Sequence, residues 1–470
     1  MSAPDLLSLP EGKTLEFKRD LSSLKPILRT LVAFANTAGG TLVIGRAEDG
    51  AVLGLPDVFA AERRLVSAVF DSISPPMTPE IEIFTHEGKD LLVVKVAHWH
   101  GPFYLKAEGP ERGVYIRLGS TNRPAGPEIL EELRRSLSGL SFDRLPCSEG
   151  TPADLDMKKI RAAFAESGRR VSEQKLESLG LLVPYGGRHV PSNGGVILFG
   201  REAIRARFFP DANVGCARFQ GTDKVEFLDR LDLEGTPLDA LEAVPNFIRR
   251  NTRLAGRIEG MRRRDIPEYP PVTVREVLLN ALVHADYSRK GMRILVAIYD
   301  DRMEIQSPGM LPFGMTLDDF KAGVSRIRNQ VIARVFRDLG LIEQWGGGYR
   351  RILDDCKRGG YPEPEWVELG SAVRVVVKPR PDIGSGPGRR SDETVFETIH
   401  DTVNETLNKR QKWFVHEIEE GRQPHAPSII KRFRCSRATA MRDIAHLIDS
   451  GRVEFVGSPK TGRYRLKGPA

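Results

Sequence analysis

Two acidic side chains and a lysine near the N-terminus have the types and spacing on which metal-dependent nucleases rely. Glu16 and Lys18 lie two residues apart in the segment TLEFKRD, and Glu11 lies just upstream. The segment predicts a short strand, in which both side chains project from one face. Mg²⁺ and Mn²⁺ bind hard oxygen ligands, often with a lysine nearby. Glu48 follows the predicted strand TLVIG, where a hairpin turning at Asp49-Gly50 would bring it alongside as a third ligand.

The same stretch contains Gly12-Lys13-Thr14, which could be the end of a phosphate-binding loop. That loop needs a further glycine five residues before Gly12, and Leu7 stands there. No strand pattern precedes the stretch and no complete copy of the motif occurs elsewhere, so we expect a turn that leads into a strand. The metal-site interpretation also has a structural alternative. Glu16 and Lys18 could simply pair with each other or with Arg19 on a solvated face.

Three segments within about residues 10–140 together resemble the Schlafen core, an AlbA-like nucleic-acid-binding domain. They are LEFKRD, AFANTAGGTLVIG with DGAVLGL behind it, and GPFYLKAEGPERGVYIRLGSTNRPA. The resemblance implies a surface that binds RNA or DNA. In nuclease-active Schlafen proteins three acidic residues carry out cleavage of tRNA or rRNA. They match Glu11, Glu16 and Glu48, with Asp49 as the neighbouring candidate for the third, and imply Mg²⁺ or Mn²⁺ as cofactor.

The same segments also have a purely fold-forming interpretation. LKPILRTLVAFANTAGG predicts a helix that Gly39-Gly40 ends, with Asn36 capping the helix end and the glycines supplying positive φ. A buried strand would follow. DLLVVKVAHW and GVYIRLGS predict further strands, so we expect an α/β or α+β domain over residues 1–145 that serves either as a binding module or as a nuclease.

A second group of candidate site residues lies on the segment TVREVLLNALVHADY. It predicts an amphipathic helix with Thr273 as its N-cap, and places Glu276 and Asn280 four residues apart on one face. The segment resembles a helix of GHKL-type ATPases that supplies a glutamate to activate water and an asparagine to hold Mg²⁺. The resemblance implies ATP as ligand, with contacts from Glu276, Asn280, Gly309, Gly346 and Gly348.

One departure from the GHKL pattern accompanies this resemblance. Where the family has an adenine-reading Asp-x-Gly-x-Gly, this chain has Ser307-Pro308-Gly309. WGGGYRRI resembles the second glycine box, whose backbone amides could contact a phosphate. The wider run over residues 190–380 is similar to bacterial proteins described as RecG-like helicases or transcriptional regulators, although no helicase motor motif is present. GGVILFG and VGCARFQG predict buried strands in this run, and a scaffold or dimer interface is the alternative to ATP binding.

The C-terminal residues predict a basic module beyond a linker rich in Pro, Gly and Ser at residues 379–393. A helix over residues 426–433, a turn, a second helix that Ser436 caps and Gly451 ends, and a hairpin follow in order. This order resembles winged-helix domains, used either for DNA or for protein contacts. Lys and Arg exceed Asp and Glu by eight over residues 422–467. The predicted nucleic-acid contacts are Arg437, Thr439, Arg442, Lys460, Arg463 and Arg465.

Length and composition indicate a multidomain α/β and α+β protein. The chain has 470 residues, a formal net charge of +7 and a pI near 9.2, which is compatible with nucleic-acid binding. Its four cysteines fit neither a zinc site nor a disulfide framework, and no secretory signal or membrane helix is evident, so we expect a cytoplasmic protein. The expected domains are residues 1–145, a connecting α/β region at 146–265, a GHKL-like block at 266–380, a linker at 381–393 and a winged helix-turn-helix at 394–470.

Three functional hypotheses follow. The first is a nucleic-acid-binding regulator with a nucleotide-sensing GHKL-like domain, which we expect to be a homodimer because winged-helix regulators usually read paired half-sites. The second is a Schlafen-like metal-dependent ribonuclease in a toxin or phage-defence setting. The third is a nucleotide-gated interaction scaffold.

Overall fold

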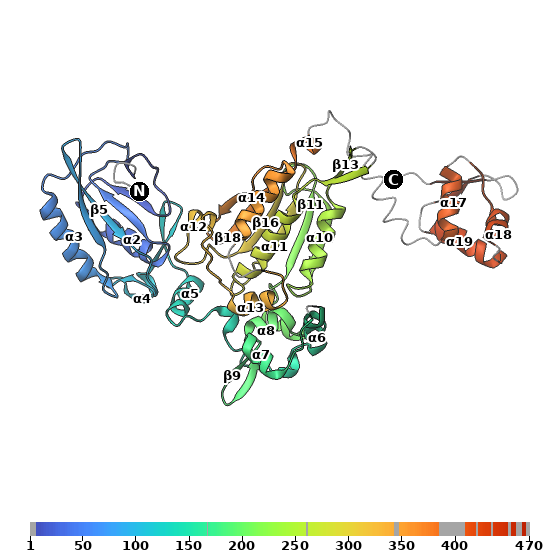
Figure 1. The fold of residues 1–470 in the computed structure, drawn as a ribbon, viewed down its shortest axis with the longest axis horizontal. Coiled ribbons are helices and arrows are strands. Elements are labelled where there is room, and N and C mark those ends of the chain that lie inside the picture. Colours follow the sequence, from blue (N-terminus) through green and yellow to red (C-terminus); the bar gives the residue numbers. More distant parts are fainter. Residues whose placement is uncertain are drawn as a thin grey trace. The chain divides into compact units, whose positions relative to one another are not determined.

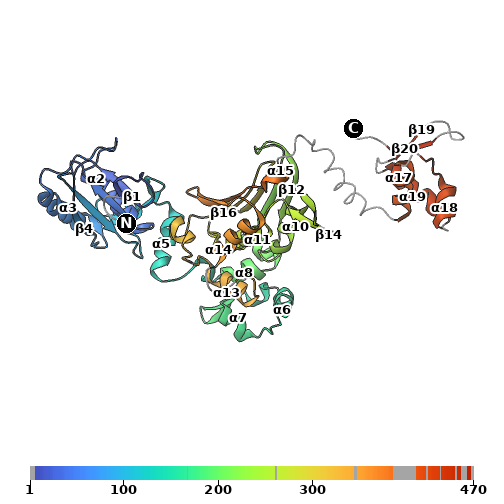
Figure 2. The same cartoon turned by 45° about the horizontal axis from the view of Figure 1, so that its top comes forward.

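The computed structural model divides into two compact units, Met1–Ser385 and Gly386–Ala470, with a boundary inside the predicted linker. Figures 1 and 2 show the elements of each unit. No helix among the described residues is long and apolar enough to cross a membrane. The described residues are 6–166, 168–259, 262–342, 347–384, 409–419, 422–433, 436–449, 453–456 and 463–466.

The N-terminal sheet has four strands in the order β1 (Leu15–Lys18), β2 (Gly40–Ile44), β5 (Lys89–Val96) and β4 (Glu80–His86). β1 pairs with β2 in parallel, and the other pairs are antiparallel. Leu15 and Phe17 of β1 pack in an apolar cluster on one face of the sheet. Because side chains alternate along a strand, Glu16 and Lys18 lie together on the opposite face, as the sequence predicted.

The predicted hairpin after β2 is wrong. β2 pairs with β1 and β5, and the following turn keeps only an isolated bridge between Arg46 and Val52. The apolar strand TLVIG therefore lies in the interior of the sheet, with β1 on one side and β5 on the other. Neither edge of β2 is free to pair with the residues that follow it. Glu48 lies on the exposed turn between the two bridge residues.

Helices α2 (Leu24–Asn36) and α3 (Val58–Ser72) contact this sheet. Asn36 does not cap the end of α2: its buried amide donates to the carbonyls of Phe103 and Tyr115, and its carbonyl accepts from the Phe103 amide. Gly39 has the expected positive φ of 76°, whereas Gly40 is needed for close approach, since a Cβ there would lie 2.6 Å from the Phe34 ring.

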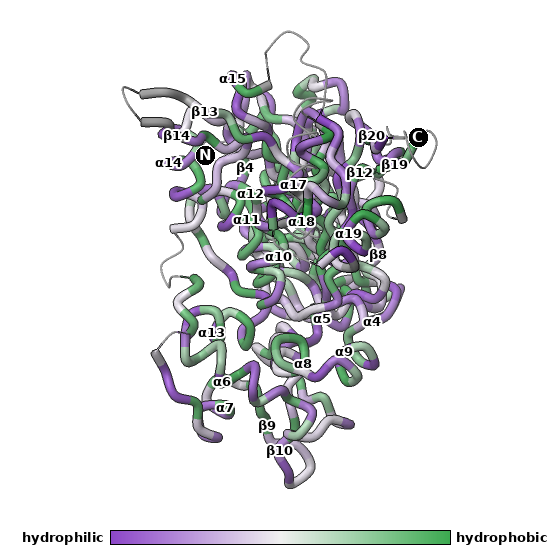
Figure 3. Tube along the Cα trace, turned by 90° about the vertical axis from the view of Figure 1, so that its right-hand side faces the viewer, coloured by the Kyte–Doolittle hydropathy of each residue, from purple (hydrophilic) through white to green (hydrophobic). Residues whose placement is uncertain are grey.

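Short elements complete the N-terminal region and lead into a small helical region. Figure 3 shows hydrophobic (green) and hydrophilic (purple) residues interspersed along the chain. The N-terminal elements are β3 (Ile73–Ser74), β6 (Tyr104–Leu105), α4 (Gly109–Arg112), β7 (Tyr115–Leu118), β8 (Thr121–Pro124) and α5 (Pro127–Leu137). The helical region contains two short 3₁₀ helices (Phe142–Arg144 and Pro152–Asp154), α6 (Met157–Glu166), α7 (Glu173–Leu179), β9 (Leu182–Tyr185), β10 (Arg188–Pro191), α8 (Asn193–Phe199) and α9 (Glu202–Phe208).

The segment GGVILFG forms helix α8 and not the predicted strand. All seven residues of α8 are buried, and the Ser192 hydroxyl caps the helix by accepting from the Gly195 amide at 2.9 Å. A short apolar run has the same appearance in a buried helix and in a buried strand, so the serine cap is what distinguishes them here.

A six-stranded sheet forms the central region. Its order is β12 (Phe227–Leu233), β11 (Val214–Phe219), β15 (Ile294–Ile298), β16 (Met303–Pro308), β18 (Ala372–Val377) and β17 (Glu365–Glu368), with only the β11–β15 pair parallel among these strands. The remaining elements are α10 (Ala240–Arg250), β13 (Leu254–Glu259), β14 (Arg262–Pro267), α11 (Pro271–His284), α12 (Leu317–Lys321), α13 (Gln330–Asp338), α14 (Gly348–Gly359) and α15 (Pro381–Gly384).

Helix α11 carries the predicted site residues, and its start differs from the prediction. It begins after Pro270, and Thr273 lies in its first turn, where both its amide and its hydroxyl donate to Asp355 of α14. Thr273 therefore joins α11 to α14 and is not the N-cap. α11 contacts α10, α14 and β16, which places one of its faces toward the six-stranded sheet (Figures 1 and 2).

The described residues of the C-terminal unit form three helices and a two-stranded antiparallel sheet. These are α17 (Lys409–Glu419), α18 (Ala426–Phe433), α19 (Arg437–Asp449), β19 (Val453–Val456) and β20 (Arg463–Leu466). The second and third helices and the hairpin match the predicted elements, and α17 was not predicted. The Ser436 hydroxyl accepts from the Thr439 amide at 3.2 Å, as an N-cap does. The buried core of the unit is Phe414, Ile429, Ala440, Ile444, Leu447 and Val453.

Candidate functional site

The carboxylate of Glu16 is neutralised by two cations. It accepts from the ammonium of Lys18 on one oxygen and from the guanidinium of Arg117 on the other. Arg117 is completely buried, and it also donates to the carbonyls of Gly12 and Leu15. A carboxylate in this position is fully satisfied by its partners, so the geometry favours a structural ion pair.

The other two predicted carboxylates do not join Glu16. Glu11 accepts from the backbone amide of Phe17 at 3.0 Å, which fixes the entry into β1. Glu48 lies on the exposed turn that follows β2. Among the described residues no three His, Cys, Asp or Glu side chains are arranged to hold a metal ion. The predicted Glu11–Glu16–Glu48 metal site is therefore not assembled in this part of the chain.

Sequence reasoning missed Arg117. It lies in the segment GVYIRLGS, which predicts a strand and gives no sign that its arginine is buried. The signal that could have found it is the unbroken run of large apolar and aromatic neighbours around a single arginine in β7. A buried arginine needs an acidic partner, and Glu16 is the buried carboxylate of β1.

The face that carries Glu16 and Lys18 forms an open polar hollow. Arg29 of α2, Tyr115 of β7 and Asn122 of β8 line it with them. Hydroxyl, amide and cationic groups of this kind are the usual contacts to a nucleic-acid backbone. The hollow is a candidate nucleic-acid surface made by the Schlafen-like residues.

Glu108 stabilises the rim of this hollow in a pH-dependent way. Its pKa is lowered from 4.5 to about 2, first by the Tyr115 hydroxyl, which donates at 2.6 Å, and then by Arg29 and Lys25. Because the folded pKa is the lower one, this stabilisation is complete above pH 4.5 and is lost as the pH falls toward 2.

We therefore expect Glu108→Gln to lower the urea midpoint of the N-terminal region at pH 7 and to flatten its decline between pH 4.5 and 2. Urea unfolding at pH 7 and pH 3 measures both effects. The exposed Glu48→Gln is the matched control. An equally steep decline in Glu108→Gln and in the wild type would contradict the assignment.

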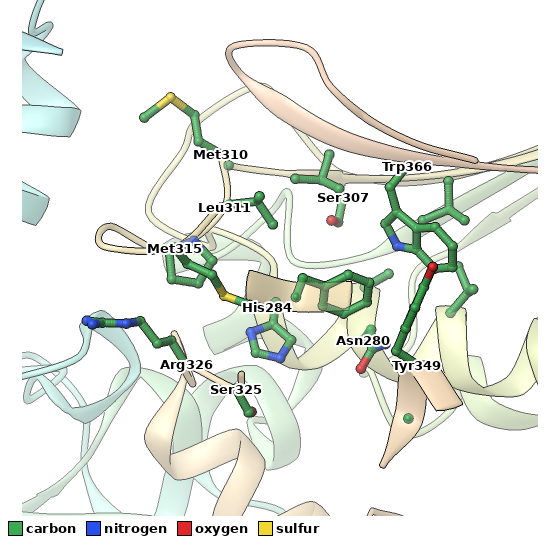
Figure 4. A pocket seen from close by; sticks show the side chains of 18 of the residues that line it. Asn280, His284, Ser307, Met310, Leu311, Met315, Ser325, Arg326, Tyr349 and Trp366 are labelled. Carbon is green, nitrogen blue, oxygen red and sulfur yellow. The ribbon is translucent and has the colours of Figure 1, made fainter. Parts of the chain in front are cut away.

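The central region contains a pocket between α11 and the six-stranded sheet. It has a cavity volume of about 130 Å³. Figure 4 shows Asn280 and His284 of α11 on one side, Ser307 of β16 on the opposite side, and Trp366 and Tyr349 together at one end. The predicted GHKL residues Asn280, Gly309 and Gly348 all line this pocket, so the structure does bring them together.

Glu276 lies beside the pocket and does not line it. Its buried carboxylate accepts from Arg275 and from Arg351, both at 3.1 Å. A Cβ on Gly348, the first residue of α14, would lie 3.1 Å from the Glu276 carboxylate, so this glycine allows the helix to approach. The two arginines therefore occupy the carboxylate of Glu276 outside the pocket.

The backbone conformation and the close packing at Gly309 require a glycine, independently of any ligand. It has a φ of 97°, and a Cβ there would lie 2.7 Å from the Cβ of Asp286. Gly346 of the second glycine box lies outside the described residues, and Gly347 caps α14.

His284 is a polar group of the pocket that the sequence did not single out as a ligand-binding residue. Its Nδ1 is buried and has no hydrogen-bond partner among the described residues. Burial, with a smaller effect from Arg328, lowers the pKa of His284 to about 4, so the imidazole is neutral at pH 7. A neutral imidazole offers one donor and one acceptor to a ligand.

Three aromatic rings form one end of the pocket. Phe320 of α12, Tyr349 of α14 and Trp366 of β17 have ring centroids 5.3–5.4 Å apart in each pair. The three rings are half-buried. Rings gathered in this way can stack against a flat ligand.

The pocket fits an adenine nucleotide only in part. Asn280 is in place for the Mg²⁺ role that the GHKL resemblance assigns it, and Gly348 and the start of α14 are near enough to line the cavity. The base-reading aspartate is absent, and Ser307 is the side chain at that position of β16. If a nucleotide binds, Mg²⁺ would supply charge neutralisation at its phosphates, and Ser307 and His284 would face its base.

The predicted nucleic-acid contacts of the C-terminal unit differ in exposure. Arg437, Arg442 and Arg463 are exposed, whereas Thr439 is half-buried and its hydroxyl lies 2.9 Å from that of Ser436. Arg465 is exposed and donates to Glu454 at 2.5 Å, which offsets its charge. Lys460 lies outside the described residues.

Comparison with known proteins identifies two domains. Residues 11–126 match the family "Schlafen, AlbA_2", and residues 291–377 match "Putative ATP-dependent DNA helicase recG C-terminal". The N-terminal domain of a "Putative ATP-dependent DNA Helicase RecG-related Protein" from Nitrosomonas europaea is 33% identical over 27% of this chain and 94% of that chain, with a TM-score of 0.22. The DIP2311 protein from Corynebacterium diphtheriae is 18% identical over 98% of this chain and 97% of that chain, with a TM-score of 0.41.

The search of curated proteins gave no match. The two family matches cover the sheet that carries Glu16 and the strands β15, β16, β17 and β18 that form one wall of the pocket. The chain therefore belongs to the proteins that combine a Schlafen AlbA_2 domain with a RecG-like, GHKL-type HATPase domain.

Proposed function

We propose that this chain is a nucleic-acid-binding regulatory protein whose GHKL-like domain senses a nucleotide or a related ligand. The observation that carries the proposal is the exposed, basic start of α19. Arg437 and Arg442 are exposed there, five residues apart, directly after the Ser436 cap. A helix that presents arginines at its N-terminal end, after a shorter helix and before a hairpin, has the layout of a winged-helix reader of the major groove.

A second surface supports nucleic-acid binding independently. The open hollow of the Schlafen AlbA_2 domain presents Lys18 and Arg29 beside Asn122. Both cations also have acidic partners, so their contribution to a phosphate contact would be smaller than that of free side chains. We assign the main affinity to the C-terminal unit for this reason.

A shared loop supports the sensing role. Residues 310–315 form one wall of the pocket, while Met310 packs in an apolar cluster with Val114, Ile116, Leu130 and Leu133 of the N-terminal region. The amide of Gly314 donates to the Thr37 carbonyl at 2.6 Å. A ligand that moves this wall would also disturb the contacts of the Schlafen AlbA_2 domain, so the loop offers a physical connection between the pocket and that domain.

An ion pair adds to the same connection. The ammonium of Lys13 donates to Glu368 of β17 at 2.7 Å, and the same carboxylate accepts from the amide of Leu311 in the pocket wall. Gly12-Lys13-Thr14 thus acts as a joint between the two domains. Lys13, which could have belonged to a phosphate-binding loop on sequence grounds, makes this contact between domains.

The nuclease hypothesis gains no support from the geometry. Glu16 is held by Lys18 and Arg117, and Glu48 stands apart on its turn. The homodimer, which would present two readers to paired half-sites, stays a prediction.

The proposal is tested by gel shift with the full chain and with a chain that ends at Ser385. We expect the full chain to bind duplex DNA with a steep salt dependence, and the shortened chain to lose most of that affinity, because the basic helix is removed. Equal binding by the two chains would assign the nucleic-acid contact to the Schlafen AlbA_2 domain alone.

A further inference from the structure

The pocket between α11 and the six-stranded sheet is lined almost entirely by uncharged groups. Of the described side chains that line it, only Arg326 carries a charge at pH 7, and its guanidinium donates to the Phe313 carbonyl at 3.4 Å. Figure 4 shows that this group lies at the edge of the pocket. No described lining residue is acidic, so nothing in the described wall is suited to hold a metal ion by its own carboxylate.

The size of the cavity limits what can enter it. An engineered apolar cavity of about 150 Å³ holds one benzene molecule. The cavity here is about 130 Å³, a similar volume, so a single small planar ring system fits it. A triphosphate tail would need room beyond this volume.

The walls offer the contacts that a planar heterocycle needs. Tyr349 and Trp366 contribute aromatic rings at one end, where the two rings meet edge to face. Asn280, His284 and Ser307 supply amide, imidazole and hydroxyl groups on two opposite sides, as Figure 4 shows. The buried Nδ1 of His284 has no hydrogen-bond partner among the described residues, so part of the hydrogen-bonding capacity of the imidazole remains unused.

We propose that this pocket binds an uncharged, nucleobase-sized heteroaromatic ring through stacking on Trp366 and hydrogen bonds to Asn280, His284 and Ser307, and that neither Mg²⁺ nor a triphosphate is required. The inference rests on the proposed sensing function and names its ligand class. A GHKL site recognises adenine with a carboxylate, whereas only neutral groups would contact the ring in this pocket. Because all the proposed contacts are to the ring, the ring supplies most of the binding free energy.

Isothermal titration of the full chain with adenine, adenosine and ATP, each with Mg²⁺ and with EDTA, tests the proposal. We expect adenine and adenosine to bind with a Kd within about tenfold of that for ATP, and EDTA to change none of the three. Trp366→Ala should weaken adenine binding by roughly tenfold or more, since stacking of a base on an aromatic side chain has about this effect.

Two controls separate loss of binding from loss of folding. Tyr185→Ala removes an exposed aromatic side chain on β9, outside the pocket, and should leave the Kd unchanged. Ser307→Ala removes one hydroxyl with little change of volume and should weaken adenine binding several-fold.

ATP that binds more than a hundredfold tighter than adenosine, and only with Mg²⁺, would overturn the proposal. So would the absence of any binding by adenine and adenosine at millimolar concentration.

The titration that tests ligand binding to this pocket and the gel shift that tests nucleic-acid binding can fail independently. The gel shift depends on α19, which belongs to the other unit of the chain. A failed titration with an intact gel shift would reject only the ligand class, whereas a failed gel shift would reject the nucleic-acid-binding function itself.

Discussion

Replacement of Arg117 by methionine is expected to destabilise the Schlafen AlbA_2 domain by about 3 kcal/mol, because the buried carboxylate of Glu16 loses a completely buried partner and keeps only Lys18, whose side chain is 30% exposed. The change also removes the donors to the carbonyls of Gly12 and Leu15, which lie on either side of the turn into β1. Methionine fills much of the arginine volume, so the loss would come from charge and hydrogen bonding more than from an empty cavity.

Hydrogen exchange of the β1 and β2 amides, together with urea unfolding of the full chain, measures this effect. Arg19→Met is the matched control, because Arg19 follows β1 directly and its side chain is 74% exposed. The double variant Glu16→Gln/Arg117→Met should recover part of the loss, since no buried carboxylate is left without Arg117 and the partly exposed Lys18 still reaches solvent. If Arg117→Met were no more destabilising than Arg19→Met, the structural role of the Glu16–Arg117 pair would be rejected.

The second large effect concerns nucleic-acid affinity. The double variant Arg437→Gln/Arg442→Gln is expected to weaken duplex binding at least tenfold, since each lost arginine contact to a base or phosphate costs about 1–3 kcal/mol when it is a specific one. The slope of log K against log salt should also become less steep, by about 0.9 for each phosphate contact that is removed.

The matched control for this variant is Arg161→Gln/Arg170→Gln. Arg161 and Arg170 are exposed and lie in the helical region, outside α19, and their replacement changes the net charge by the same amount. Equal loss of affinity in the two double variants would indicate a general charge effect and would argue against α19 as the reader. Fluorescence anisotropy with one labelled duplex at several salt concentrations gives both the affinity and the slope.

Local sequence patterns predicted most helices and strands around the two sites. The remaining elements depend on contacts with segments that are distant in the sequence. The strand that carries Glu16 and Lys18 follows from its alternating pattern. The helix that carries Asn280 forms where it was predicted, but it is not amphipathic as expected, because most of its residues are buried. The hairpin prediction failed because β2 takes both its partners from distant segments. The strand prediction for α8 failed because its apolar run is buried on every side.

The site residues show the same division. Spacing alone placed Glu276 and Asn280 on one helix, but it could not show that Glu276 would be held by Arg275 and Arg351. Arg117 and His284 were missed because burial is what gives each of them its role. The apolar neighbours of Arg117 indicate that it is buried, but no local pattern shows that Glu16 is its partner. The Lys13–Glu368 ion pair joins residues separated by most of the first unit, so no local pattern predicts it.

The apolar cluster around Met310 has a consequence for biosynthesis. Val114, Ile116, Leu130 and Leu133 emerge from the ribosome early, but Met310, which covers them, is added well over a hundred residues later. At about 5–20 residues per second, this interval is on the order of ten seconds or more. During that time the nascent Schlafen AlbA_2 domain presents an uncovered apolar face. A chain truncated before the pocket wall would present the same face permanently, and would be expected to aggregate more readily than the complete protein.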